Sequence, residues 1–510
     1  MTHVLLINPS YGDTYRKVRA GVVNPIYPVL GLAAIAGEAL RRGHDVRILD
    51  LSYDLYDWRR LEAILETDRP DVLGITATTP LANQLRDISI LAKDVSPQTV
   101  VVAGGPHPSA LPASTLRESM LDGVLTGEAD MAFGDLCDGA DLASLPGAWT
   151  RDGDQIVSNG TSGLVGSLDD LAFPAWHLYD PAEYKHRVSR LLARTPPAAS
   201  VEFSRGCVFK CDYCASKNTM GLGYRKKSPT RCAEEVLRVH RLGWGEFALT
   251  DDIFTSDNKW AARVCEAIVR AGAPLPWTCT NGIRVESADS GLFELMFRAG
   301  CYRVSFGMES GRDDVLMAFG KGGKASIEQG REAAKMARRA GIETNGYFML
   351  GLSADDEETL EDTIRYAASL ELDMISFGIT VPFPGTPMFQ VASREGRVRS
   401  WDWDRYNAYE QAELFTHPKL SRQQVLGAMN RAYRKALLGN PSFVLRRFGR
   451  SLRTGELLQD LRYLAKFVGR PAYREGPVGI QYYARDRWPT RDFEHELPEE
   501  TDYPRARRAV

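Results

Sequence analysis

The 510 residues lack the features that are typical of membrane, secreted, nucleic-acid-binding and repeat proteins. No run of about 18 uninterrupted apolar residues occurs, so we expect no membrane-spanning helix. The first residues, MTHVLLINPSYG, have neither a basic region nor a cleavage site, which argues against a signal peptide. Charge is nearly balanced, with 63 basic and 66 acidic residues, so nothing favours nucleic acid as a partner. No internal repeat is present beyond an alternation of strand-like and helix-like segments.

Cysteine is also scarce and unevenly spread. Three of the eight cysteines lie within residues 207–214, and the others stand alone at Cys137, Cys232, Cys265, Cys279 and Cys301. This spread does not fit a disulfide framework. It predicts a protein of the reducing cytoplasm with one metal site.

Short apolar segments alternate with helical ones over the first part of the chain. Strands are expected at 3–8, 45–51, 71–77, 99–105 and 123–130, with helices at 28–42 and 81–95. This order predicts an α/β fold with a doubly wound parallel sheet, whose ligand would sit at the carboxyl ends of the strands. We assign residues 1–140 to this domain and the Gly- and Asp-rich residues 141–197 to a connector.

A second series of strand and helix segments follows the connector. Strands are expected at 200–206, 245–252, 275–282, 302–310, 344–352 and 373–382. Six such units predict a parallel sheet curved into a partial (β/α)6 barrel over residues 198–400. Residues 401–510 are expected to form a mainly helical cap over the barrel, helical at 421–470, with a loop-like or disordered tail from 484.

The strongest motif is the sequence Cys-Val-Phe-Lys-Cys-Asp-Tyr-Cys at the start of this second series. Spacings of four and three put the thiolates of Cys207, Cys211 and Cys214 on one short loop. Thiolates are the soft ligands that iron–sulfur clusters need. Three of them would leave one iron open for a substrate. A zinc loop completed by a distant His or Cys is the other interpretation, although zinc sites usually use paired spacings.

A CxxxCxxC motif just after a strand that opens a βα barrel resembles the radical S-adenosylmethionine (SAM) superfamily. The resemblance covers roughly residues 198–400 and implies a 4Fe–4S cluster whose open iron binds the amino and carboxylate groups of SAM. Thr250-Asp251-Asp252 departs from the glycine-and-acid pattern that is common at the second strand. Gly307-Met-Glu309-Ser310 is similar to the family's fourth-strand motif. The SAM contacts implied by the resemblance are Tyr213, Asp251, Asp252, Glu309, Ser310, Phe348 and Gly351.

The N-terminal motifs resemble the cobalamin-binding domain that precedes some radical SAM barrels. Glycines at 104 and 105 would let the backbone approach a large flat ligand, and threonines follow the third strand. The implied cobalamin contacts are Thr76, Thr78, Thr79, Gly104, Gly105, Pro106, His107, Gly127 and Glu128. The Asp-x-His-x-x-Gly motif that supplies a lower cobalt ligand is absent. We therefore interpret His107 as a loop histidine packed on the cofactor rather than a cobalt ligand.

Together the two domains resemble cobalamin-dependent radical SAM enzymes, whose commonest activity is methylation of an unactivated carbon. The resemblance implies that one SAM loads a methyl group onto cobalamin. A second SAM yields a 5′-deoxyadenosyl radical, which activates the substrate. A radical cyclase, dehydratase or mutase without methyl transfer is the alternative within the class, and a cobalamin-binding sensor or interaction module is the alternative outside it. A single cysteine before residue 207 argues against a methylthiotransferase, which carries a second three-cysteine cluster.

The expected partners are a small-molecule substrate of biosynthetic origin and an external electron donor such as flavodoxin or ferredoxin. The substrate itself is not readable from the sequence. Trp401, Trp403, Tyr406 and Tyr409 could line a substrate pocket, but a packed seam between domains is favoured. The basic segment 446–453 could contact an anionic or lipid-like substrate, but a solvated basic face is favoured.

Overall fold

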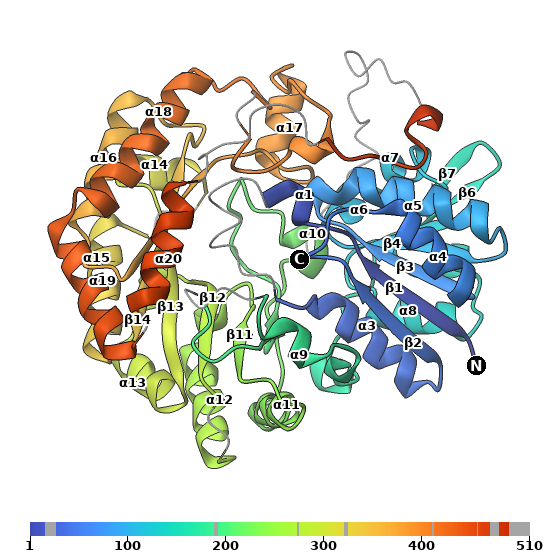
Figure 1. Ribbon diagram of the computed structural model, residues 1–510, viewed down its shortest axis with the longest axis horizontal. Helices are drawn as coiled ribbons and strands as arrows, with labels where there is room; N and C mark the ends of the chain where they lie inside the picture. Colours follow the sequence, from blue (N-terminus) through green and yellow to red (C-terminus); the bar gives the residue numbers. More distant parts are fainter. Residues whose placement is uncertain are drawn as a thin grey trace.

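The computed structural model contains two large sheets, each with its own helices. The mainly parallel N-terminal sheet lies on one side and the parallel sheet of the barrel on the other (Figure 1). The structure describes residues 1–15, 27–187, 192–272, 275–320, 325–410, 413–455, 457–469 and 479–488. Within these ranges no helix is long and apolar enough to cross a membrane.

The N-terminal sheet has the strand order β2-β1-β3-β4-β5-β6-β7. Its strands are β1 (His3–Asn8), β2 (Asp45–Asp50), β3 (Val72–Thr76), β4 (Val100–Gly104), β5 (Gly123–Leu125), β6 (Ala148–Asp152) and β7 (Gln155–Ser158). The first five pair in parallel. In such a doubly wound order the chain changes direction between β1 and β3, and the crevice beyond their carboxyl ends is the usual ligand site. The predicted fold class is confirmed.

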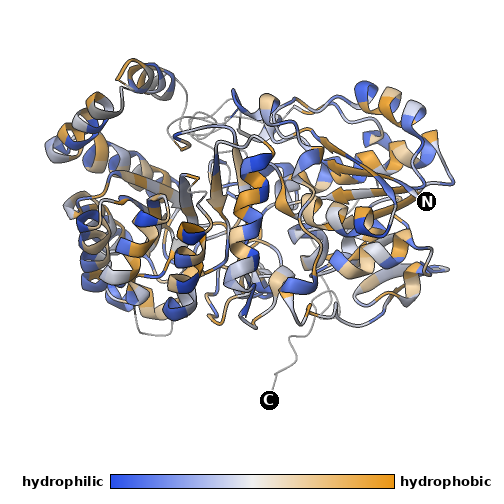
Figure 2. Ribbon diagram, turned by 90° about the horizontal axis from the view of Figure 1, so that it is seen from below, coloured by the Kyte–Doolittle hydropathy of each residue, from blue (hydrophilic) through white to orange (hydrophobic). Residues whose placement is uncertain are grey.

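Helices cover both faces of this sheet because neighbouring residues of each strand point to opposite sides. Val4 and Leu6 of β1 pack under α3 (Leu30–Arg41) and α8 (Asp130–Cys137). Leu5 and Ile7 pack under the helices of the other face, α4 (Trp58–Asp68) and α5 (Ala82–Val95). Figure 2 shows these strands as hydrophobic ribbons between helices of mixed hydropathy. The short helices α1 (Gly12–Tyr15), α6 (Pro106–Ala110) and α7 (Pro112–Arg117) complete the domain.

The connector contains a hairpin that the sequence interpretation missed. Strands β6 and β7 pair antiparallel and extend the sheet beyond β5. An Asp-Gly-Asp turn joins them, and Gly153 has a φ of +59°, as a tight hairpin turn requires. The Asp-Gly pair was the available signal, but β7 is short and mostly exposed. Later in the connector, Trp176 and Tyr184 of α9 (Pro181–Tyr184) pack against Trp244 at the barrel.

The second sheet has the order β15-β14-β13-β12-β11-β8, and every pairing is parallel. Its strands are β8 (Ala198–Val201), β11 (Glu246–Leu249), β12 (Trp277–Ile283), β13 (Cys301–Glu309), β14 (Glu343–Leu350) and β15 (Met374–Ile379). β8 and β15 do not pair with each other, so the sheet is an open, partial barrel. All six predicted strands are present, with ends shifted by a few residues.

Amphipathic helices form the outer layer of the barrel. They are α11 (Pro229–Arg241), α12 (Asn258–Arg270), α13 (Ser290–Arg298), α14 (Asp313–Ala318), α15 (Ile327–Arg339) and α16 (Glu357–Ser369). Side chains of Asp257, Asp289, Ser326 and Asp356 cap four of them by accepting hydrogen bonds from backbone N–H groups. Such caps satisfy the free N–H groups of a first turn and fix where each helix begins.

The C-terminal region is helical over the predicted range. After α17 (Pro387–Arg394), α18 (Arg422–Tyr433) packs beside α16 and against β15, so it continues the outer layer. A π-helical turn (Arg434–Leu438) leads to α19 (Pro441–Thr454) and α20 (Leu457–Val468). The barrel cap stays a prediction.

Residues 479–488, which we call the C-terminal strap, return to the N-terminal domain. The backbone N–H groups of Tyr483 and Ala484 both donate to Asp87 of α5 at 2.8 Å. Tyr482 Oη donates to Asp404, and Arg487 pairs with Asp94 at 2.6 Å. The tail expected to be loop-like or disordered from 484 is an ordered loop over residues 484–488, because Ala484 and Arg487 have partners 397 and 393 positions away in the chain. The rest of the tail lies outside the described residues.

Two of the aromatic residues near 401 lie in a seam between the domains. Trp403 and Tyr406 are buried in one cluster with Ala110 and Leu111 of the N-terminal domain. Their rings lie 4.9 Å apart. The structure therefore supports the seam for these two residues.

Candidate functional site

The three cysteines sit on a loop that leaves the carboxyl end of β8. The base of this loop is closed by the ribbon of β9 (Ser204–Arg205) and β10 (Arg225–Lys226). Gly206 has a φ of +84°, and a Cβ there would collide with the backbone oxygen of Gly223. Cys207, Cys211 and Cys214 are half-buried, and none of the three is in a disulfide. A tightly closed loop that presents three thiols beside a strand end suits an iron–sulfur cluster.

The two aspartates after β11 differ in their surroundings. Asp251 is buried and accepts hydrogen bonds from the Phe203 N–H at 2.7 Å and from the Ser204 hydroxyl. Burial raises the pKa of Asp251 to about 8. Asp251 thus fastens the base of the cysteine loop, and the predicted SAM contact lacks a free carboxylate there.

Asp252 faces the cysteines instead. Its Oδ2 atom is buried and has no hydrogen-bond partner among the residues that the structure describes. Burial raises the pKa of Asp252, and its charge acts on both Cys207 and Cys214. A buried carboxylate oxygen without a partner is costly, so a cationic ligand group fits beside it.

Tyr213 and Glu309 form a pair across the mouth of the barrel. The Tyr213 hydroxyl donates to Glu309 Oε1 at 3.0 Å. Glu309 ends β13 with a φ of +57°, a left-handed conformation that non-glycine residues rarely adopt. Such strain is often kept where a side chain must be aimed at a ligand.

Ser310 and Gly351, two of the predicted SAM contacts, lie in different surroundings. Ser310 is fully buried, and its hydroxyl lies 3.3 Å from Thr363 Oγ1 of α16, so it points into the helical layer. Gly351 lines a cavity at the carboxyl ends of β14 and β15, together with Ile379, Thr380, Phe415, His417 and Val425. The buried Thr380 Oγ1 has no hydrogen-bond partner in the described structure. Gly351 therefore stays a candidate SAM contact, whereas Ser310 is already engaged.

Phe348 lies on the face of β14 that packs against the helical layer. Its ring packs against Tyr366 of α16 and Phe377 of β15, at centroid distances of 6.0 and 5.4 Å. Side chains alternate along a strand, so Tyr347 and Met349 point the other way. Tyr347 is 39% exposed, and Phe348 is 1% exposed. Phe348 therefore faces the helical layer, an orientation that does not favour its predicted contact with the adenine, and that contact stays a prediction.

This orientation predicts how a Phe348→Leu variant behaves. We expect its free energy of unfolding to fall by about 1 kcal/mol, because the outer-layer packing is lost in part. We expect the SAM dissociation constant to change less than about twofold, since binding sites on the other face are untouched. Thermal melting and equilibrium dialysis would measure the two effects. A large rise in the dissociation constant at unchanged stability would contradict the assignment.

The glycine and threonine motifs of the N-terminal domain meet at the carboxyl edge of its sheet. Gly105 has a φ of +94°, and a Cβ there would come within 2.7 Å of Thr76 Oγ1. Thr78 Oγ1 lies 2.7 Å from the Tyr11 hydroxyl, which follows β1. These loops flank the crevice between β1 and β3. A bare backbone at Gly104 and Gly105 fits the close approach of a large ligand.

His107 is held inside the protein. It is the second residue of α6, is 3% exposed, and its Nδ1 atom lies 3.4 Å from Thr79 Oγ1. Its ring packs edge-to-face on Trp403 at 5.0 Å. Burial lowers the pKa of His107 to about 3, with a further contribution from Arg86. His107 is therefore a neutral packing residue that is joined to the C-terminal region.

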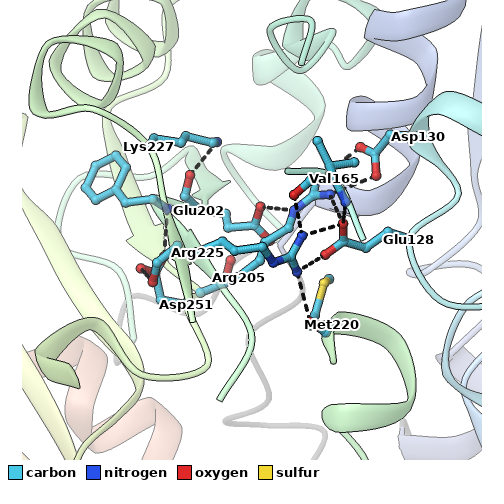
Figure 3. A network of polar contacts seen from close by, with 12 residues as sticks. Glu128, Asp130, Val165, Glu202, Arg205, Met220, Arg225, Lys227 and Asp251 are labelled. Carbon is cyan, nitrogen blue, oxygen red and sulfur yellow. Dashed lines mark hydrogen bonds and ion pairs between the residues drawn. The ribbon is translucent and has the colours of Figure 1, made fainter. Parts of the chain in front are cut away.

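Glu128 takes part in the contact between the two domains. Its carboxylate pairs with Arg225, accepts the Val165 N–H at 3.0 Å, and lies 3.8 Å from Arg205 (Figure 3). The neighbouring Gly127 has a φ of +69° and donates its N–H to Ser109 at 3.0 Å. The carboxylate of Glu128 is thus engaged in an ion pair, and its predicted cobalamin contact stays a prediction. Sequence alone could not reveal the pair because Arg225 lies 97 residues away.

Arg205 lies at the centre of this network. It donates to Asp130 at 2.8 and 3.1 Å and to Glu202 at 2.6 Å (Figure 3). All three side chains are at least 90% buried. Burial alone would raise the pKa of Asp130, but the charge of Arg205 and its hydrogen bonds hold that pKa below its usual value. The network ties the base of the cysteine loop to the N-terminal domain.

The cysteine loop also touches the glycine loop. Its helix α10 (Lys217–Met220) packs against α6, which follows Gly105. Asn218 Nδ2 donates to the backbone oxygen of Gly385 at 3.0 Å, and a Cβ on Gly385 would lie 2.9 Å from that of Ala110. The two predicted cofactor loops therefore border one junction between the domains.

These observations can be compared with known proteins. Residues 201–367 match the radical SAM superfamily, and residues 16–136 match the B12 binding domain. An uncharacterized methyltransferase of Pyrococcus horikoshii is 30% identical over 437 residues, which cover 84% of this chain and 91% of that protein. An anaerobic magnesium-protoporphyrin IX monomethyl ester cyclase of Cereibacter sphaeroides is 25% identical over 93% of this chain and 77% of that protein.

A solved structure has the same fold. The radical SAM methyltransferase TsrM from Kitasatospora setae, with cobalamin and a 4Fe–4S cluster bound, superimposes with a TM-score of 0.67 at 17% identity, over 85% of this chain and 89% of that one. The three thiols, the Asp252 Oδ2 atom that has no hydrogen-bond partner in the described structure, and the Gly104–Gly105 backbone fit the three cofactors. The chain therefore belongs to the radical SAM superfamily, in a form with an N-terminal B12-binding domain, and its cofactors are a 4Fe–4S cluster, SAM and cobalamin.

Proposed function

We propose that this enzyme methylates an unactivated carbon of a small-molecule substrate by cobalamin-dependent radical SAM chemistry. The observation that carries the proposal is the contact of α10 with α6, which joins the cysteine loop to the glycine loop of the B12-binding domain. Methyl transfer needs both cofactors within reach of one substrate, and that junction provides such an arrangement.

The residues of the chain would hold the cofactors and orient them. When bound, the cluster and SAM supply a 5′-deoxyadenosyl radical, and cobalamin supplies a methyl carrier. Cys207, Cys211 and Cys214 would ligate the cluster. Asp252 would bind the SAM ammonium group, and the Tyr213–Glu309 pair would contact the rest of SAM. Thr76 and the Gly104–Gly105 backbone would border the cobalamin, with His107 packed behind them as a neutral residue.

The test is an anaerobic incubation of the reconstituted enzyme with SAM, cobalamin and a strong reductant. Products are followed by mass spectrometry, with SAM carrying a deuterated methyl group. We expect S-adenosylhomocysteine to form only when cobalamin is present, together with 5′-deoxyadenosine. An external donor such as flavodoxin or ferredoxin is proposed to replace the chemical reductant, and candidate acceptors can then be screened for the deuterium label.

A radical cyclase is the second candidate, and the similarity to the protoporphyrin ester cyclase favours it. The same incubation separates the two. Formation of 5′-deoxyadenosine alone, at the same rate with and without cobalamin, would exclude the methyltransferase and leave cyclisation or a related radical reaction.

Asp252→Asn tests the proposed ammonium contact. We expect the apparent KM for SAM to rise about 10- to 100-fold, since a hydrogen bond to a charged group contributes about 1.5–3 kcal/mol. The control is Asp251→Asn, which changes the neighbouring acid that is already engaged by Phe203 and Ser204. Deoxyadenosine formation at varied SAM would measure both. Equal effects of the two variants would argue against a special role for Asp252.

A further inference from the structure

Helix α19 presents its polar side to the barrel. Arg450 is 5% exposed and pairs with Glu343 at 2.6 Å. Arg447 pairs with Asp460 of α20 at 2.8 Å, and Arg446 donates to the backbone oxygen of Leu372 at 3.3 Å. This orientation is the reverse of a usual surface helix, whose apolar side faces the core. The expected solvated basic face is therefore wrong for these three arginines.

The apolar side of the same hairpin faces solvent. Leu445 and Phe448 of α19 are 69% and 50% exposed, and Leu458 of α20 is 74% exposed. Their neighbours on these sides, Val444, Leu452, Leu461 and Leu464, are exposed as well. Spacings of three and four residues put each set on one face of its helix. We call these seven residues the outer face of the α19–α20 hairpin.

The orientation is fixed by specific contacts rather than by loose packing. Asn440 caps α19 through the Phe443 N–H at 3.1 Å and donates to the Ala368 backbone oxygen at 2.9 Å. Glu343 is shared by Arg450, Arg303 and Arg194 at 2.6 to 2.8 Å. Turning the apolar side inward would break these bonds. An apolar face that is held outward in this way is typical of a binding surface.

Charges beside the outer face point to its partner. Arg462 and Lys466 of α20 are exposed, and both are basic. The acid Asp460 is engaged by Arg447 and Ser451. Leucine and phenylalanine with flanking Arg and Lys are the composition of helices that lie in the interface of an anionic bilayer. A second copy of the chain would bring the basic residues of both hairpins together, which disfavours self-association through this face.

We propose that the outer face of the α19–α20 hairpin docks on the surface of an anionic lipid bilayer. The leucines and Phe448 enter the boundary between head groups and acyl chains, while Arg462 and Lys466 contact lipid phosphates. Arg450 binds Glu343 at the amino end of β14, so this part of α19 lies at the amino ends of the barrel strands, whereas the cysteine loop leaves the carboxyl end of β8. The proposal does not depend on which reaction the enzyme catalyses.

The test uses the full-length enzyme with its cofactors and sedimentation with lipid vesicles. We expect binding to vesicles of phosphatidylcholine mixed with phosphatidylglycerol, and at least about tenfold weaker binding to phosphatidylcholine alone. Phe448→Trp keeps an apolar ring at the centre of the face and adds a fluorophore. We expect brominated acyl chains to quench the added emission. Equal binding to both vesicle types, or no quenching, would overturn the assignment.

Matched variants distinguish binding through this face from non-specific adsorption of exposed apolar residues to vesicles. Leu445→Gln, Phe448→Gln, Leu458→Gln and Leu461→Gln combined should weaken vesicle binding at least about tenfold, since each removes exposed apolar surface. The control replaces Met120 and Phe297 by Gln, because these are 53% and 50% exposed but lie elsewhere. The melting temperature checks that each variant is folded. An equal loss of vesicle binding in the control variant would overturn the proposal. It would also be overturned if the wild-type enzyme does not bind vesicles but forms a dimer, and if the fourfold variant no longer forms that dimer.

Discussion

Replacing Cys211 by alanine is expected to abolish SAM cleavage. Two thiols remain on the loop, Cys207 and Cys214, and they cannot hold a site-differentiated cluster that needs three. Without the cluster no electron reaches SAM, so 5′-deoxyadenosine formation should drop to the uncatalysed background. That is a loss of more than about 10⁶-fold, the lower end of enzymatic rate enhancements. Iron and sulfide analysis after anaerobic reconstitution, together with product analysis, would measure it.

The matched control is Cys265→Ala. Cys265 is a free cysteine of the same barrel, but it is fully buried in α12 and lies in the hydrophobic core. Its loss should leave the iron content unchanged and cost about 1 kcal/mol in the free energy of unfolding at most. A Cys211→Ala enzyme that keeps iron and activity would contradict the assignment of the cluster ligands.

The Arg205→Ala variant is expected to lose about 3–5 kcal/mol of stability. The substitution leaves the carboxylates of Asp130 and Glu202 buried without their cation, and removing one partner of a buried ion pair costs this much. Because Arg205 joins the base of the cysteine loop to the N-terminal domain, we expect the single melting transition to split as the domains uncouple. Differential scanning calorimetry of the holoenzyme would show both effects.

The control for this variant is Arg238→Ala. Arg238 pairs with Glu234 at 3.0 Å on the surface of α11, and both side chains are about half exposed. Exposed pairs of this kind contribute about 0.3–0.5 kcal/mol. If Arg205→Ala melts like Arg238→Ala, the buried network does not hold the domains together.

The sequence pattern predicted the strands and helices in which apolar residues recur at a regular spacing. Each strand of the partial barrel combines an apolar run with a following amphipathic helix, and the apolar runs at 302–310 and 344–352 became β13 and β14. Spacing along one loop was enough to predict the cluster ligands, because a short loop keeps its cysteines together whatever the rest of the chain does. Signals that lie within one short segment can be interpreted without knowledge of the tertiary fold.

Partners that are distant in the chain could not be predicted. Phe348 and Tyr347 are neighbours in sequence, and only the pairing of β14 with β13 and β15 decides which of them faces the barrel interior. The resemblance implied that Glu128 contacts cobalamin, yet in the structure Arg225 pairs with it from the other domain. The sequence predicted that residues 446–453 of α19 are basic, but the side to which these basic side chains point depends on Glu343, which is distant in the chain.

The C-terminal strap also constrains how the chain is made. Asp87 of α5 receives its N–H donors from Tyr483 and Ala484, almost 400 positions later in the chain. At synthesis rates of about 5–20 residues per second, that interval takes roughly 20–80 s. During this time the N-terminal domain has already left the ribosome. The carboxylate of Asp87 still lacks its two backbone N–H donors, and the C-terminal strap does not yet cover the outer side of α5. These contacts of the N-terminal domain can therefore form only after the C-terminal strap has been synthesised.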